Sequence, residues 1–259
     1  MPTRTEQGDL LFALFAGHGE FPRIVYAPGN YVQGFNLTRK AFYMADTYQV
    51  PVIILTDQYF LDSNCTVPGL AIDSPMSASS IVATDEGYRR FRVTESGISP
   101  RGIPGYGTGI VCLDSDEHDE AGYITEDFSV RVEQMNKRMR KLQSMGPDSI
   151  PPDLYGPVDY RCLVVSWGST LSCILEAIKA SGRSDTALLH FSQVHPLHED
   201  TKKYLERARY TAIVENNYGS QFGTLIRMHA GREFNRKILK YNGMPFSVEE
   251  LAAEFKKFT

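Results

Sequence analysis

The sequence is poor in cysteine. Its 259 residues include only Cys65, Cys112, Cys162 and Cys173, and no two of them form a CxxC pair. Because the ligand spacings typical of an iron–sulfur cluster are missing, we do not expect this chain to hold such a cluster by itself. Reduced structural cysteines in a cytoplasmic protein are the expected state.

Targeting and membrane signals are also missing from the sequence. No apolar run reaches the roughly 20 residues that a membrane-spanning helix needs. The first ten residues, MPTRTEQGDL, lack the apolar core of a signal peptide. The formal net charge is −4 and the basic residues are spread along the chain, so nothing favours nucleic acid. We therefore expect a cytoplasmic protein that binds neither membrane nor nucleic acid.

The first region, residues 1–62, alternates helical and strand patterns. Two helices are expected, over residues 10–15 and about 35–48, and two strands, over residues 23–27 and 50–57. The second strand is apolar on both faces, which predicts a parallel sheet that is covered on both sides. The region is too short to cover such a sheet, so we expect the rest to come from upstream or from a partner.

The second region, residues 63–155, has little regular pattern. Residues 97–127 read GISPRGIPGYGTGIVCLDSDEHDEAGYITED, with six glycines and two prolines. A stretch of this length without regular structure is usually functional or linking, and this one is too apolar for a disordered tail. We therefore expect an arm that lies against another surface.

A helix is expected after the irregular stretch, with an apolar stripe on one side and basic residues on the other. The stripe consists of Phe128, Val132, Met135, Met139 and Leu142, and the basic face of Arg131, Lys137, Arg138, Arg140 and Lys141. Two interpretations stay open: a helix packed on its own domain with its basic face in solvent, and a helix at a subunit boundary.

The third region, residues 156–259, repeats a strand–loop–helix unit three times. The units are RCLVVSWGSTLSCILEAIKASG, TALLHFSQVHPLHEDTKKYLERA and YTAIVENNYGSQFGTLIRMHAG. This alternation predicts a small α/β domain with a parallel sheet. Ser247 and Glu250 predict a capping box for a final helix.

Three loops that come after strands are candidates for ligand contact or for packing. In SWGST, Ser169 or Thr170 can cap the next helix, and the N-terminus of that helix could take an anion. His195 lies in a loop at the carboxyl end of a strand, where open α/β sheets bind ligands. Asn216 and Asn217 belong to the loop ENNYGSQFG, which is rich in hydrogen-bonding groups.

Residues 114–120, DSDEHDE, form an acidic stretch around one histidine. The ligand order and glycine of an EF-hand are absent, and one histidine with adjacent acids cannot make a helical HExxH face. We expect a solvated or partner-facing loop there, and we predict no metal site in the chain.

The loop AGHGEFPR is the most site-like stretch of the first region. Two glycines flank His18 and allow close backbone approach, and Arg23 could bind a carboxylate with two hydrogen bonds. A structural role for this loop is the alternative.

Seven segments, taken in order, resemble the alpha subunit of 2-oxoacid:ferredoxin oxidoreductases, in particular the 2-oxoglutarate synthase type. The segments are GDLLFALFAGHGEFPRIVYAPG, VPVIILTDQYF, VTESGISPRGIPG, SDEHDEAGYITED, RVEQMNKRMRKL, VVSWGST and VENNYGSQFGTLIR. The resemblance covers essentially the whole chain.

The resemblance implies a fold and a chemistry. The domains are the C-terminal part of a thiamine-family pyrimidine-binding domain (1–62), a connecting arm and helix (63–155) and a transketolase C-terminal-like α/β domain (156–259). Thiamine diphosphate attacks the 2-oxo carbon, carbon dioxide leaves, the acyl group goes to coenzyme A, and electrons pass through iron–sulfur clusters to ferredoxin. The beta subunit binds the diphosphate through magnesium, and the iron–sulfur cluster also belongs to a partner subunit.

This sequence departs from the family pattern at its start. The family's pyrimidine-binding domain normally begins well upstream and includes a YP-type substrate loop, an acidic residue that activates the aminopyrimidine and a GPSTG-like loop. MPTRTEQGDL resembles the segment directly after that GPSTG-like loop. The resemblance therefore implies a split gene, a misassigned start or a degenerate copy, and a further polypeptide that supplies the missing N-terminal half.

The sequence thus predicts a subunit of a 2-oxoacid:ferredoxin oxidoreductase that is inactive alone, with 2-oxoglutarate as the expected substrate. A non-catalytic or degenerate assembly subunit is the alternative. His18 and Arg23 are the expected residues on the substrate side of the cofactor cleft.

Overall fold

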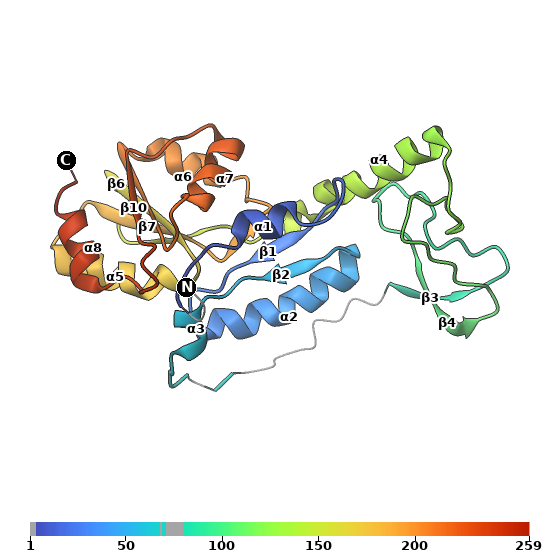
Figure 1. The fold of residues 1–259 in the computed structure, drawn as a ribbon, viewed down its shortest axis with the longest axis horizontal. Helices are drawn as coiled ribbons and strands as arrows, with labels where there is room; N and C mark the ends of the chain where they lie inside the picture. Colours follow the sequence, from blue (N-terminus) through green and yellow to red (C-terminus); the bar gives the residue numbers. More distant parts are fainter. Residues whose placement is uncertain (1–3, 68, 71–79, 259) are drawn as a thin grey trace.

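Two sheets and a projecting arm make up the molecule (Figure 1). The structure is a computed structural model, and it describes residues 4–67, 69–70 and 80–258. The first three residues of MPTRTEQGDL lie outside this range.

The larger sheet has five strands, β5 (Asp153–Tyr155), β6 (Cys162–Trp167), β7 (Thr186–Phe191), β9 (Tyr210–Glu215) and β10 (Arg236–Leu239). Their order is β10-β9-β6-β7-β5, and every pair is parallel except β5 with β7. β6 and β7 are buried along their whole length, as strands covered on both faces must be. The predicted parallel α/β domain is therefore confirmed.

Helices cover both faces of this sheet (Figure 1). They are α5 (Leu171–Ser181), α6 (Thr201–Arg207), α7 (Gln221–Ala230) and α8 (Val248–Phe255), and the short 3-10 helix η2 (Gly168–Thr170) precedes α5. Residues of α5 and α8 share one buried cluster, and residues of α6 and α7 belong to another. The predicted capping box of α8 is confirmed, because the Ser247 side chain accepts from Glu250 N and Glu250 accepts from Ser247 N.

The smaller sheet contains β1 (Ile24–Tyr26), β2 (Val52–Ile54) and β8 (Gln193–His195). β1 pairs parallel with β2 and antiparallel with β8, which comes from the third region of the sequence. The helices beside this sheet are α1 (Leu10–Phe15), α2 (Tyr31–Tyr48) and the short α3 (Gln58–Asp62). The β1–β2 pair is parallel as predicted, whereas the antiparallel β8 makes the sheet mixed. β2 is only half-buried within this chain, and cover from elsewhere stays a prediction.

The two sheets share one hydrophobic core. Leu10, Val25 and Ala27 of the first region pack in the same buried cluster as Trp167 and Phe222 of the third. The predicted domain boundaries at residues 62 and 155 stay a prediction. Buried contacts and the β1–β8 pair join the first region to the third.

The arm lies at the far end of the molecule from the five-stranded sheet (Figure 1). It contains the parallel pair β3 (Ile81–Thr84) and β4 (Arg101–Gly107), and helix α4 (Phe128–Met145) with the short η1 (Gly146–Asp148) leads back to the sheets. Asp127 caps α4 by accepting from Ser129 N and Val130 N.

Helix α4 turns four of its basic side chains inward, those of Lys137, Arg138, Arg140 and Lys141, contrary to the interpretation that left the basic face in solvent, while Arg131 stays exposed. Lys137 is only 4% exposed, whereas Phe128 and Val132 of the apolar stripe are 87% and 60% exposed. Carbonyl oxygens of the arm and of Gln49 at the end of α2 accept from these side chains, and the long stems of lysine and arginine cover apolar surface on the way.

Candidate functional site

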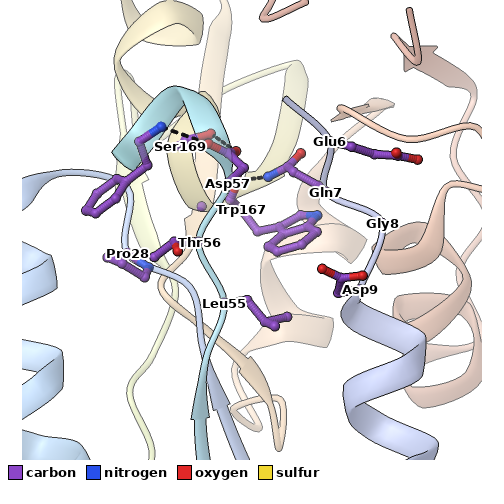
Figure 2. A pocket seen from close by; sticks show the side chains of 12 residues that line it. Glu6, Gln7, Gly8, Asp9, Pro28, Leu55, Thr56, Asp57, Trp167 and Ser169 are labelled. Carbon is purple, nitrogen blue, oxygen red and sulfur yellow. Dashed lines mark hydrogen bonds between the residues drawn. The ribbon is translucent and has the colours of Figure 1, made fainter. Parts of the chain in front are cut away.

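A small pocket lies where the carboxyl ends of β1, β2 and β6 come together (Figure 2). The walls are residues 6–9, which precede α1, the segment 55–57 after β2, and the turn 167–169 after β6, with Pro28 and Phe60. Carboxyl ends of parallel strands are the usual ligand edge of α/β sheets. The space open to the centres of water molecules is about 20 Å³, which suits roughly one water.

Asp57 is the central carboxyl group of this pocket. It is the N-cap of α3, where it accepts from Phe60 N at 2.9 Å, and it also accepts a short hydrogen bond from Ser169 Oγ. Burial raises the pKa of Asp57 above its ordinary value, although the hydrogen bond from Ser169 partly opposes the shift. The pocket therefore holds a carboxyl group that can take up a proton more easily than a surface aspartate.

The turn 167–169 has left-handed backbone at Gly168, whose φ is 60°. Trp167 O accepts from Gln7 Nε2 and from Thr170 Oγ1, both at 2.9 Å. The expectation that Ser169 or Thr170 caps α5 was wrong, because neither side chain bonds to the helix N-terminus. Ser169 Oγ donates to Asp57 instead, and Thr170 Oγ1 donates to Trp167 O.

Residues 5–9 lie across the carboxyl edge of the larger sheet. Gln7 N donates to Asn216 O at 2.7 Å, Asn216 N donates to Gln7 Oε1 at 2.9 Å, and Asn217 Nδ2 donates to Gln7 O at 3.1 Å. β6 and β9 are neighbours whose connections run to opposite sides of the sheet, so this is its topological switch point. The crevice there is thus filled by Gln7, and Asn216 and Asn217 hold the chain's own backbone.

His190 is fully buried beside Gly168 of this pocket, whereas His195 is only partly buried and pairs with Val25 on β1. His190 Nε2 is 2.9 Å from Gly168 O, and burial lowers the pKa of His190 to about 4. His195 lies on β8, and burial, followed by the charges of Arg23 and His229, lowers its pKa to about 4. Both rings are therefore neutral at pH 7.

The AGHGEFPR loop lies apart from the pocket. His18 is exposed between Gly17 and Gly19, whereas Arg23 is buried. Arg23 Nη1 donates to the carbonyl oxygens at the end of α1, those of Ala13 at 2.8 Å and Ala16 at 2.7 Å. Arg23 thereby fixes α1 to the loop, and its contact with a substrate carboxylate stays a prediction.

The acidic stretch makes hydrogen bonds within the arm. Glu117 accepts from both terminal nitrogens of Arg138 at 2.9 and 2.8 Å, and this contact comes first among those that lower the pKa of Glu117 to about 2. Asp119 accepts from three successive backbone amides, and Glu120 pairs with Arg89. Across the described residues, no group of three or more His, Cys, Asp or Glu is placed to hold a metal ion.

Comparisons with known proteins decide the family. A family model described as "Pyruvate flavodoxin/ferredoxin oxidoreductase, thiamine diP-bdg" matches residues 1–137, more than half of the chain. The chain belongs to this family. The resemblance to alpha subunits of 2-oxoacid:ferredoxin oxidoreductases is thereby confirmed.

Relatives of this family match nearly the whole chain. The alpha subunit of 2-oxoacid:ferredoxin oxidoreductase 1 from Sulfurisphaera tokodaii is 36% identical over 97% of the chain and 41% of its own length. The 2-oxoglutarate synthase subunit KorA of Methanothermobacter thermautotrophicus is 24% identical over 96% of the chain and 67% of its own length. The chain thus spans about two fifths of the former relative.

A solved structure shares the fold. It is 2-oxoglutarate:ferredoxin oxidoreductase from Magnetococcus marinus, with 2-oxoglutarate, coenzyme A and succinyl-CoA bound. The likeness has a TM-score of 0.87 at 24% identity and covers 99% of this chain and 46% of that one.

Among the described residues, none of the helices is both long and apolar enough to cross a membrane.

The pocket around Asp57 does not fit thiamine diphosphate. Its free space suits roughly one water, and its charged side chains Glu6, Asp9 and Asp57 would repel a diphosphate. The pocket residues alone therefore do not form a site for this cofactor.

Sequence reasoning found Ser169 but missed Asp57 and Gln7. Asp57 carries a signal, because it is the first acid after an apolar strand that the sequence places in a parallel sheet. Gln7 carries none: its partners Trp167 and Asn216 lie more than a hundred residues away, and a single glutamine in a polar stretch has no pattern.

Proposed function

We propose that this chain acts as an alpha-type subunit of a 2-oxoacid:ferredoxin oxidoreductase. The observation that carries the proposal is the 36% identity to an alpha subunit across 97% of the chain. In the proposed reaction one 2-oxoacid, one coenzyme A and two oxidised ferredoxins give one acyl-CoA, carbon dioxide, one proton and two reduced ferredoxins. Each ferredoxin takes one of the two electrons that the oxidation releases.

The proposed substrate is 2-oxoglutarate. Two lines of similarity support this choice: KorA subunits are among the relatives, and the fold is that of an enzyme solved with 2-oxoglutarate bound. The product would then be succinyl-CoA. Assay of the assembly with pyruvate and 2-oxobutyrate alongside 2-oxoglutarate tests the choice.

The proposed assembly contains a beta subunit that holds thiamine diphosphate, magnesium and an iron–sulfur cluster. We place this assembly in the cytoplasm. The small size of the pocket supports this division of labour. The chain alone is then inactive, and coenzyme A-dependent decarboxylation with viologen reduction by the pure chain would contradict the proposal.

His18 and Arg23 are the proposed residues on the substrate side of the cofactor cleft. Exposure of His18 leaves it open to a partner or substrate, and Arg23 is fixed behind the same loop. In the purified assembly, His18→Ala and Arg23→Lys should each raise the Michaelis constant for the 2-oxoacid. Unchanged kinetics in both variants would remove this assignment.

The test of the function is native purification of the chain with mass spectrometry of the polypeptides that accompany it. A thiamine-binding beta subunit, with 2-oxoacid-dependent ferredoxin reduction, is the expected result. A non-catalytic assembly subunit is the second candidate. The hydrogen bonds of Arg23 to Ala13 and Ala16 favour it, because they give Arg23 a structural role that needs no substrate. An assembly whose activity survives removal of this chain would favour that candidate.

A further inference from the structure

A second cavity lies under helix α4, where the helix crosses the end of α2. Its volume is about 140 Å³, ample for more than one water molecule. Four of its lining residues, Arg90, Lys137, Arg138 and Lys141, are cationic, and Gln49 and Gln134 add polar groups. None of the lining residues that the structure describes is acidic.

Three of these cations have only neutral oxygen partners among the described residues. Lys137 Nζ donates to Phe91 O at 2.6 Å and Gln134 Oε1 at 3.4 Å. Lys141 Nζ donates to Gln49 O at 3.0 Å, and Arg90 Nη2 donates to Gln49 Oε1 at 2.9 Å. Arg138 alone is paired with a carboxylate, that of Glu117.

The carboxylates nearest the cavity are already engaged. Glu120 is close enough to Lys137 to raise its pKa, but Glu120 Oε2 pairs with Arg89 at 3.1 Å and Oε1 accepts from Val93 N at 2.7 Å. His118 also lines the cavity, with its ring 3.7 Å from that of Phe91.

Positive charge without a nearby carboxylate is costly in a buried space, and the pKa values of Lys137 and Lys141 are lowered there. Burial, and then the charges of Lys141, Arg90 and Arg138, lower the pKa of Lys137 to about 7. Burial, with Arg90 and Arg138, lowers the pKa of Lys141 to about 8. Lys137 is only 4% exposed, so solvent does little to relieve the repulsion.

We propose that this cavity binds a small oxyanion of the phosphate class, held by Lys137, Lys141 and Arg90. Donors that approach from the arm and from α4 suit the oxygens of a tetrahedral anion, and lysine and arginine are the usual cations for phosphate. The bound anion ties α4 to the arm and to the end of α2. Free phosphate and the phosphate group of a larger molecule share this chemistry.

Isothermal titration of the full chain with inorganic phosphate and with adenosine monophosphate, at constant ionic strength in sodium chloride, tests the proposal. We expect a dissociation constant of about 1 mM or below. Lys137→Gln and Lys141→Gln should each weaken binding roughly tenfold or more, since each removes a charge-assisted hydrogen bond. Lys202→Gln, on an exposed lysine of α6, is the matched control and should bind like wild type.

Comparing the affinities for inorganic phosphate and adenosine monophosphate shows whether the cavity recognises free phosphate or the phosphate group of a larger molecule. Similar affinities identify the phosphate group alone as the recognised group, and tighter binding of the nucleotide identifies a larger phosphorylated molecule. Binding of neither ligand, or binding that survives in the Lys137→Gln/Lys141→Gln double variant, overturns the proposal.

A second measurement needs no variant and so does not depend on variant folding. An anion raises the pKa of both lysines, so binding at pH 8 should take up protons. Titration with sulfate, which does not itself titrate there, in two buffers of different ionisation enthalpy measures this uptake. Sulfate binding without proton uptake would place the anion elsewhere and overturn the assignment.

Discussion

Glu215 shows how a single buried carboxylate organises the edge of the larger sheet. It is the last residue of β9 and is fully buried. It accepts hydrogen bonds from five donors: Trp167 Nε1 at 3.2 Å, Asn217 Nδ2 at 2.8 Å, Ser220 Oγ at 3.0 Å, Phe222 N at 2.9 Å and Gly223 N at 3.0 Å. The two backbone donors belong to the first turn of α7, where a negative charge is favourable.

Replacing Glu215 by glutamine should destabilise the chain strongly. The new amide group would point its own N–H groups at buried donors and leave at least one of them without a partner. We expect the free energy of unfolding in urea to fall by about 3 kcal/mol or more. Glu233→Gln is the control, because Glu233 is an exposed ion-pair partner and should change stability by about 0.5 kcal/mol or less. Equal effects of the two substitutions would contradict the prediction.

His190 should make the chain less stable as the solution becomes acidic. Its folded pKa of about 4 lies below the ordinary 6.5, so between these values the unfolded chain binds more protons than the folded one. Stability is therefore complete above pH 6.5 and falls as the pH drops towards 4, by at most about 1.4 kcal/mol per pH unit for one group. His195 adds a similar slope.

The substitution His190→Gln should flatten this slope, because glutamine cannot titrate but can still donate to Gly168 O. Urea unfolding at several pH values from 4 to 7 measures it. His18→Gln, on an exposed loop, should leave the slope as in wild type. An unchanged slope in His190→Gln would mean that His190 is not the group that takes up the proton.

At the scale of elements, helix α4 has the most unusual distribution of side chains. Its basic residues bond inward to the arm, while Phe128 and Val132 near its start point to solvent. Other large apolar side chains of the arm are also exposed, namely Ile110, Leu113, Tyr123 and Ile124. An exposed apolar surface of this kind favours contact with a partner, as the sequence predicts for the arm.

The double variant Phe128→Ser/Val132→Ser should keep its stability but lose its partner. Exposed side chains contribute little to folding, so urea unfolding should change by about 0.5 kcal/mol or less. Native mass spectrometry of the coexpressed assembly should show association with the proposed beta subunit weakened tenfold or more. Phe42→Ser, an exposed phenylalanine on α2, is the control. Full association of the double variant would exclude this face from the interface.

At the scale of the whole molecule, Gln7 and the shared core make the two sheets one unit. Calorimetry should give a single transition for both sheets, with equal calorimetric and van't Hoff enthalpies. Gln7→Ala removes one of the two donors to Trp167 O and the side-chain acceptor of Asn216 N, and should lower the free energy of unfolding by about 2–4 kcal/mol. Two transitions in the wild type would show that the sheets unfold independently.

The strands, helices and turns depend on local pattern, and so they were largely predictable. The buried strands β6 and β7 are apolar on both faces, and Ser247 with Glu250 marks the start of α8. The inward direction of Lys137 and Lys141 was not predictable. A row of basic residues on a helix predicts exposure to solvent, and the carbonyl oxygens that accept from these lysines belong to segments distant in the chain. The hydrogen bond between Asp57 and Ser169 joins the segments that follow strands of two different sheets, and no local spacing in the sequence indicates it.

The sequence by itself determined the family, the alternation of strand and helix in the third region and the irregular arm, because these depend on motifs and on side-chain periodicity. Only the tertiary structure decided that β8 joins the smaller sheet, that Gln7 fills the switch-point crevice, and that the cations of α4 enclose a cavity. The physical reason is that each of these features is a contact between residues distant in the chain. Such contacts are set by how the sheets, the arm and α4 pack together.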